Sequence, residues 1–195
     1  MLFSAKPKEP APEPPPAAFR LSVCPGTDAD GPVLCVALYD GTAYDVRAEA
    51  LPPRTPLHRI VEQAAEIAAA AGDPAAVLVL SDETDVGAVL TAMLSERGLR
   101  ATSCSVIAST ASPSPWKSGA LEVGERALVA QWRVLLQQGL VTVVPGSDIE
   151  ALKRPLGIRA AALACWLGRE GAAARSGGSV GFVRMMGRAR RGRRI

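Results

Sequence analysis

Short apolar stretches separated by turn residues predict three β-strands near the start of the chain. The stretches cover residues 20–24, 33–39 and 44–51, and Asp40-Gly41 lies between the second and the third. An Asp-Gly pair between apolar runs is typical of a hairpin, because glycine accepts the backbone angles of a tight turn. Connections this short join antiparallel neighbours, since parallel strands need a long crossover. The three strands are therefore expected to form an antiparallel meander.

The spacing of apolar positions then changes to three and four residues, which predicts a helix over residues 55–72. Thr55 suits the capping position, Pro56 is tolerated in the first turn, and Gly72 suits the closing position. This spacing gives the helix one apolar face for the sheet. That face consists of Leu57, Ile60, Val61, Ala64, Ile67, Ala68 and Ala71.

A βαβ unit is expected next. Its strand at residues 76–80 leads into a helix at 85–97, which Gly98 ends, and into a second strand at 101–107. In such a unit the two strands are parallel and the crossover is right-handed. We expect the inner face of the helix to consist of Val86, Val89, Leu90, Met93 and Leu94.

Beyond this unit the pattern predicts a loop, two helices and one short strand. The Ser/Pro-rich loop covers residues 109–119, and the helix after it runs to about Gln138. A short apolar strand at 140–144 precedes a helix from Asp148 to about residue 170, which is interrupted near Pro155. The fold class is therefore α/β, with three antiparallel strands followed by alternating helices and parallel strands in a mixed sheet. The leucines that recur by seven before Gln138 are Leu121, Leu128 and Leu135, with Trp132 beside them.

Composition divides the chain into one folded body and two tails. Residues 1–19 contain a proline-rich run from Lys6 to Pro16, so we expect a disordered leader that acts as a spacer. Residues 20–170 are expected to form one domain, because 48% apolar residues in a chain of 195 suffice for a core. Residues 171–195 form a Gly/Arg-rich basic tail.

The formal charge of +3 conceals an asymmetry between the body and this tail. Six arginines lie near the end, so the rest of the chain is net negative. An arginine run neutralises nucleic-acid phosphates without reading sequence, and its binding weakens as salt rises. A solubilising end without a ligand is an equally good interpretation. The arginines are Arg184, Arg188, Arg190, Arg191, Arg193 and Arg194.

Cysteine and histidine usage argues against a metal site built from sulfur and imidazole. The four cysteines form no CxxC pair, and His58 is the single histidine of the chain. Zinc sites need several such ligands at fixed spacing. We expect His58 at the surface and the cysteines in the core, because they lie in apolar segments. The cysteines are Cys24, Cys35, Cys104 and Cys165.

No segment of the chain has the pattern of a membrane span or of a signal peptide. The apolar stretches are shorter than the roughly 20 residues that cross a bilayer, and lysines and prolines follow the first three residues closely. We therefore expect no membrane association and a cytoplasmic location.

Three segments of the body share a resemblance to one family. Residues 82–87 read DETDVG after an apolar strand, residues 123–139 read VGERALVAQWRVLLQQG, and residues 160–166 read AAALACW. They are similar to the segments D-A-T-G-V-G and V-P-K-R-D-L-V-x-x-L-x-V-L-L-Q-x-G and to the final helix of the phage large terminase nuclease domain. The chain resembles in particular the short terminase-like members of this family that are found in bacterial genomes. Over residues 19–166 the resemblance and the order of elements together imply a ribonuclease H-like fold.

The family resemblance implies metal-dependent cleavage of nucleic acid. Two divalent ions about 4 Å apart would stabilise the attacking and leaving oxygens of a phosphodiester, and Mg²⁺ or Mn²⁺ needs several converging carboxylates. The family draws these carboxylates from the first strand, the end of the central strand and the start of the final helix. Asp82 matches the second place and would be the catalytic metal ligand. The acids that would help it are Glu83, Asp85, Asp28 and Asp30.

Substitutions at the other family positions indicate a degenerate site. The first-strand aspartate falls on Pro25, the acidic pair of the final helix falls near Pro155-Leu156, and the loop lysine falls on Glu125. Proline cannot bind a metal, and one remaining carboxylate holds Mg²⁺ weakly because the ion keeps most of its water. An aspartate in this place also commonly caps the next helix.

Two functional classes follow from these observations. We favour a catalytically degenerate, terminase-like module, such as a prophage remnant, that binds DNA through the basic tail or takes part in DNA packaging without any cofactor. The alternative is an active Mg- or Mn-dependent endonuclease. Because the chain has no GxxxxGK[ST] loop, an ATPase or another packaging partner would have to act in trans.

Overall fold

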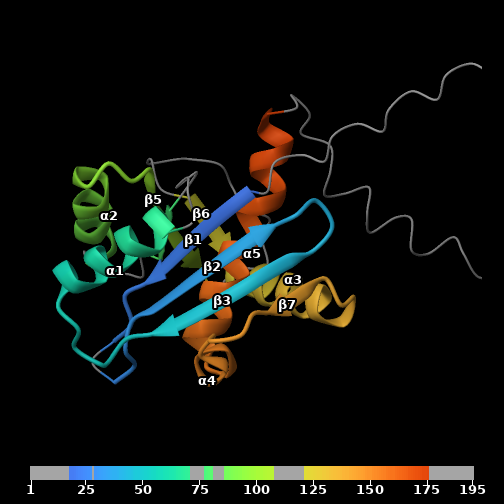
Figure 1. The fold of residues 1–195 in the computed structure, drawn as a ribbon, viewed down its shortest axis with the longest axis horizontal. Helices are drawn as coiled ribbons and strands as arrows, with labels where there is room; N and C mark the ends of the chain where they lie inside the picture. Colours follow the sequence, from blue (N-terminus) through green and yellow to red (C-terminus); the bar gives the residue numbers. More distant parts are fainter. Residues whose placement is uncertain (1–17, 28, 71–76, 81–85, 108–120, 176–195) are drawn as a thin grey trace, which may run out of the picture.

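The fold is a mixed β-sheet between two layers of helices. The computed structural model describes residues 18–27, 29–70, 77–80, 86–107 and 121–175. Figure 1 shows the strands crossing the centre, α1 and α2 at the left, and α5 behind the sheet. The elements in order are β1 (Ala18–Cys24), β2 (Val33–Tyr39), β3 (Tyr44–Ala50), α1 (Leu57–Ala70), β4 (Val77–Leu80), α2 (Val86–Glu96), β5 (Ala101–Ile107), β6 (Leu121–Gly124), α3 (Glu125–Gln137), β7 (Val141–Val143), α4 (Ile149–Lys153) and α5 (Pro155–Arg175).

The sheet confirms both the predicted meander and the predicted βαβ unit. Its strand order is β6-β5-β4-β1-β2-β3-β7. The β1–β2 and β2–β3 pairs are antiparallel, whereas the pairs β1–β4, β4–β5, β5–β6 and β3–β7 are parallel. Strand β1 therefore lies in the middle of the sheet, between the antiparallel and the parallel parts.

The β2–β3 hairpin is stabilised by its Asp-Gly pair, as the sequence predicted. The Asp40 carboxylate accepts hydrogen bonds from the amides of Thr42 and Ala43, at 2.7 and 2.8 Å. Gly41 has a φ of +104°, which a side chain would disfavour. The amide bonds from Ala43 and Thr42 lower the pKa of the Asp40 carboxyl, because they favour its charged form.

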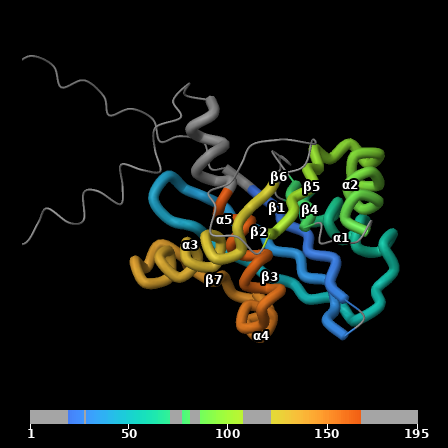
Figure 2. Tube along the Cα trace, turned by 180° about the vertical axis from the view of Figure 1, so that it is seen from behind, coloured from blue at the N-terminus to red at the C-terminus, as the bar shows by residue number. Residues whose placement is uncertain are grey.

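Successive side chains of β1 point to opposite faces of the sheet and belong to two separate apolar clusters. Leu21 and Val23 pack with α1 and α2 on one face, and Cys24 packs with α3 and α5 on the other. Ser22 also faces α5 and donates a 2.6 Å hydrogen bond to the carbonyl of Ala160. Figure 2 shows α3, α4 and α5 together from behind. A buried hydroxyl bond of this kind fixes the position of α5 against the sheet.

The last helical segment is interrupted at Pro155, also as predicted. Asp148 caps α4 by accepting a 2.9 Å bond from the amide of Ala151. Arg154 has the extended conformation that a following proline favours, and α5 begins at Pro155. Helix α5 then carries the apolar residues 160–166 into the core, where all of them are buried.

One prediction about the second half of the sheet is wrong. Residues 121–124 were expected to begin a helix, but they form β6, and α3 begins only at Glu125. Strand β6 pairs with β5 through the register Cys104↔Leu121 to Ile107↔Gly124. The spacing of seven between Leu121 and Leu128 placed Leu121 in the predicted helix. In the structure, residues 121–124 pair with the edge of β5, and local sequence does not reveal this pairing.

The predicted inner face of α2 also needs correction. Gly87, Leu90 and Leu94 are the buried residues of this helix, whereas Val86 and Val89 are 37% and 47% exposed. The helix is apolar on nearly every side, so its sequence has no single apolar stripe from which to read the orientation. Packing against β4 and β5 buries the face that carries Gly87, Leu90 and Leu94.

Among the parts of the chain that the structure describes, no helix combines the length and the apolar character that a bilayer crossing needs.

Candidate functional site at the carboxyl edge of the sheet

The carboxyl ends of four parallel strands meet at one edge of the sheet. Strand β1 ends at Cys24, β4 at Leu80, β5 at Ile107 and β6 at Gly124. The parallel registers place these ends side by side across the sheet. Ligands of open α/β sheets bind beyond such ends, so this edge is the place for a site.

The principal predicted acid follows β4 in the sequence. Strand β4 is fully buried and lies next to β1, and Asp82 comes two residues after its last residue, Leu80. Asp82 itself lies outside the described residues, as do Glu83, Asp85 and Asp28. Whether their carboxylates converge therefore stays a prediction.

Asp30 is the one predicted ligand that the structure describes. It is exposed, in the turn between β1 and β2. Its backbone amide donates a 3.1 Å bond to the Thr27 hydroxyl oxygen, and its carbonyl accepts a 2.8 Å bond from the Thr27 amide. Gly26 precedes this turn with a φ of +76°. These hydrogen bonds within the turn suffice to stabilise its conformation, so the conformation does not require a bound ligand.

The edge carries proline at the place where the family's first-strand aspartate would lie. Pro25 is half-buried and directly follows Cys24, the last residue of β1. Pro155 likewise opens α5, and no carboxylate occurs from there to Trp166. Across the described ranges, no group of three or more His, Cys, Asp or Glu side chains is arranged to hold a metal ion.

An ion pair links α3 to α5 at this edge. Glu125 is the first residue of α3, directly after β6, and Arg159 lies in the second turn of α5. The Arg159 Nε donates a 3.0 Å bond to Glu125 Oε1, and its Nη2 donates a second bond to the same oxygen. The Glu125 carboxylate also lies at a helix N-terminus, where the helix dipole favours negative charge.

Sequence reasoning missed this pair. It treated Glu125 only as the residue in place of a family lysine, and it assigned no role to Arg159. The two residues are 34 positions apart, so no helical spacing connects them.

The structure confirms the predicted positions of the cysteines in the core and of His58 at the surface. All four cysteines are free and buried, and His58 is exposed. Burial raises the pKa of Cys104 and of Cys165 to about 12. Burial raises the pKa of Cys35 as well, with smaller contributions from Cys165 and Cys24. The raised pKa values keep these three buried thiols protonated at neutral pH.

The predicted nucleic-acid-binding arginines lie outside the described residues. All six belong to the stretch 176–195, for which no position is given.

Comparison of the chain with protein-family models and with curated proteins gave no match.

Proposed function

We propose that the chain is a ribonuclease H-like protein related to phage terminase nucleases, with a degenerate metal site. In this proposal it acts as a DNA-binding or packaging-associated module. The strand arrangement supports the fold assignment, because three antiparallel strands precede the parallel ones and β1 lies at the centre. The sequence resemblance at residues 82–87, 123–139 and 160–166 supports the family.

The proposed loss of catalysis rests on one observation. At the carboxyl edge, the positions that should supply metal-binding carboxylates hold Pro25 and Pro155, and Glu125 is engaged by Arg159. A two-metal site needs carboxylates from several elements at once. With Asp82 as the one retained acid, the edge would hold a divalent ion only weakly.

A second candidate function is an active Mg- or Mn-dependent endonuclease. The observation that favours it is the position of β4, which ends next to β1 two residues before Asp82. Asp85, Asp28 and Asp30 would then complete the ligand set. In this case the carboxylates would hold the metal pair in position. The metal pair would polarise the scissile phosphate and activate water.

Plasmid cleavage separates the two candidates. The full chain is incubated with supercoiled plasmid and Mg²⁺ or Mn²⁺, beside Asp82→Ala and an EDTA control. We expect no metal-dependent nicking. Metal-dependent nicking that Asp82→Ala removes would reject the degenerate-site proposal and establish the endonuclease.

Salt-dependent DNA binding tests the role of the basic tail. Six arginines that each neutralise one phosphate give a log–log salt slope of about −5, so affinity falls about a thousandfold between roughly 50 and 200 mM salt. Deletion of residues 184–195 should abolish this binding. A variant with lysine at the six positions is the matched control, because it keeps the charge. Equal DNA retention with and without the tail would refute this role.

A further inference from the structure

Helix α5, which the basic tail follows, ends at the edge of the sheet opposite to the candidate metal site. It begins beside α4 at the carboxyl edge and passes β1 at Ala160, whose carbonyl accepts the bond from Ser22. It then continues to Arg175, about 22 Å further, whereas β1 begins at Ala18, about 14 Å from Ser22. Figure 1 shows the last turns of α5, in red, beside and beyond the start of β1. The tail arginines therefore follow a helix that ends at the amino edge of the sheet, where β1, β4 and β5 begin.

Two arginines of the folded body lie at this amino edge, in the turn between α2 and β5. The registers Leu21↔Val77 and Val77↔Ala101 place the start of β5 two strands away from β1, which is about 10 Å. Arg97 and Arg100 directly precede this start, and both are exposed. Neither of them takes part in an ion pair between described residues. Both positive charges are therefore open to an anionic ligand.

The turn that carries these arginines is held in place by the core. Leu99 lies between them in the sequence and is buried, and its amide donates a 3.1 Å bond to the carbonyl of Leu94. The Val77 amide donates a 3.0 Å bond to the carbonyl of Arg100. Gly98 supplies the left-handed φ of +79° that the turn requires. Because the backbone is already ordered, a ligand bound here does not have to order it.

The opposite edge of the sheet has the wrong charge for a polyanion. The segments 25–32 and 81–85 follow β1 and β4, and they contain carboxylates but no lysine or arginine. In the degenerate site of the proposed function, no metal pair neutralises these carboxylates, so they repel phosphates. The acids of the two segments are Asp28, Asp30, Asp82, Glu83 and Asp85.

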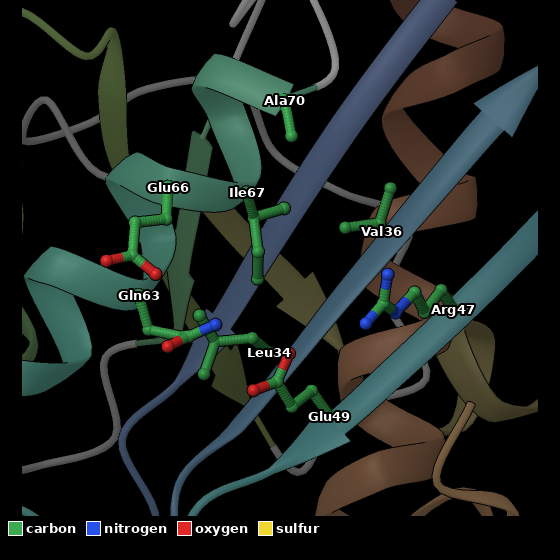
Figure 3. A pocket seen from close by; sticks show the side chains of 8 residues that line it. All are labelled: Leu34, Val36, Arg47, Glu49, Gln63, Glu66, Ile67 and Ala70. Atoms are coloured by element: carbon green, nitrogen blue, oxygen red, sulfur yellow. The ribbon is translucent and has the colours of Figure 1, made fainter. Parts of the chain in front are cut away.

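The groove between α1 and the outward side of β2 and β3 is also unsuited to a polyanion. Its volume is about 360 Å³. Figure 3 shows Arg47 and Glu49 on β3 and Glu66 on the facing side of α1, around an apolar floor that includes Leu34 and Val36. Two carboxylates against one guanidinium leave this groove net negative. It therefore does not compete with the amino edge for phosphates.

We propose that DNA held by the basic tail lies across the amino edge of the sheet, with backbone phosphates on Arg97 and Arg100. This surface rests on the DNA-binding function proposed above and adds a contact on the folded body to it. Arginine contacts to phosphates position DNA without reading its sequence. The bound DNA then lies about 23 Å, the length of β1, from the carboxyl edge that Asp82 follows in the sequence.

Salt-dependent binding of the full chain to duplex DNA counts these contacts. About eight phosphate contacts give a log–log salt slope of about −7, against about −5 for the six tail arginines alone. Arg97→Gln and Arg100→Gln should each reduce the magnitude of the slope by about 1 and weaken binding about fivefold to tenfold at roughly 0.1 M salt. Arg97→Lys and Arg100→Lys keep the charge and should keep the slope. Arg126→Gln is the matched control, because it removes the same charge from an exposed arginine of α3 at the carboxyl edge.

A tethered iron–EDTA chelate locates the bound DNA. Ser95→Cys places the chelate two residues before Arg97, and Ala29→Cys places it at the carboxyl edge; both positions are exposed, and neither change alters the charge. The four native cysteines are buried, so the new thiol is the accessible one. With ascorbate added, the chelate at position 95 should cut the bound DNA, and the chelate at position 29 should not.

The outcomes separate this surface from the function on which it rests. Tail-dependent binding with a slope that Arg97→Gln and Arg100→Gln leave unchanged would overturn the surface and leave the role of the tail intact. An equal loss with Arg126→Gln, or DNA cutting from position 29, would overturn it as well. Failure of the full chain to retain DNA at any salt concentration would reject the proposed function and this surface together. Thermal melts check that each variant folds, since every altered side chain is exposed.

Discussion

Gly157 provides the sharpest test of how α5 is held in the fold. It lies near the start of α5 and is buried where this helix meets α4. A Cβ atom at this position would lie 1.9 Å from the carbonyl oxygen of Ala151 and 2.6 Å from its carbonyl carbon. Both atoms belong to the backbone, so no side-chain rotation relieves the clash. Gly157→Ala must therefore push α4 and α5 apart.

Gly157→Ala is informative because two opposing effects contribute to its change in the free energy of unfolding. Gly→Ala within a helix ordinarily stabilises it by about 1 kcal/mol. Overpacking of a tight contact costs about 1–3 kcal/mol and more when the backbone must move. We expect the clash to dominate and Gly157→Ala to lower the free energy of unfolding by about 3 kcal/mol, or about 6–12 °C in Tm for a chain of this size.

Urea denaturation followed by circular dichroism measures this difference. The control is Gly146→Ala, since a Cβ there meets no atom within 4 Å and the φ of +81° is the one unfavourable factor. That control should cost about 1 kcal/mol. A Gly157→Ala protein as stable as the parent, or more stable, would refute the close approach of α4 to α5.

Three further predictions concern other parts of the structure. Glu125→Gln and Arg159→Gln should each destabilise the protein by about 1 kcal/mol, because the pair is only half-buried; a double-mutant cycle without coupling would contradict the contact. Asp40→Ala should destabilise the protein at neutral pH, and the difference should vanish as pH falls through the depressed pKa of folded Asp40; a difference that persists in acid would exclude the turn carboxylate as its source. Cys104 and Cys165, whose pKa is raised to about 12, should resist iodoacetamide at pH 8 and react once the protein unfolds, as mass spectrometry would show; rapid native labelling would contradict their burial.

The first part of the fold could be predicted from sequence because its signals are local. Asp40-Gly41 makes a tight turn in which the Asp40 carboxylate accepts bonds from the next amides, so β2 and β3 pair as an antiparallel hairpin. Pro155 likewise ends one helix and begins the next through restrictions on its own neighbours. Such features need no knowledge of the rest of the molecule.

The errors occurred where distant elements decide the structure. Leu121 pairs with Cys104 in the sheet, and only the edge of β5 makes residues 121–124 a strand. Helix α2 has apolar residues on several sides, so packing against the sheet decides which of them are buried. In both cases the sequence allows more than one local structure, and packing selects between them.

For the candidate site, sequence determined the kinds of residue present and structure determined their neighbours. The sequence alone shows a carboxylate at Asp82, prolines at positions 25 and 155 and a cluster of terminal arginines. Only the tertiary structure brings Glu125 to Arg159 and leaves Arg47, Glu49 and Glu66 around an open groove. Ion pairs and grooves depend on which faces of distant elements meet, and that choice is made by burial of the whole apolar surface rather than by any single segment.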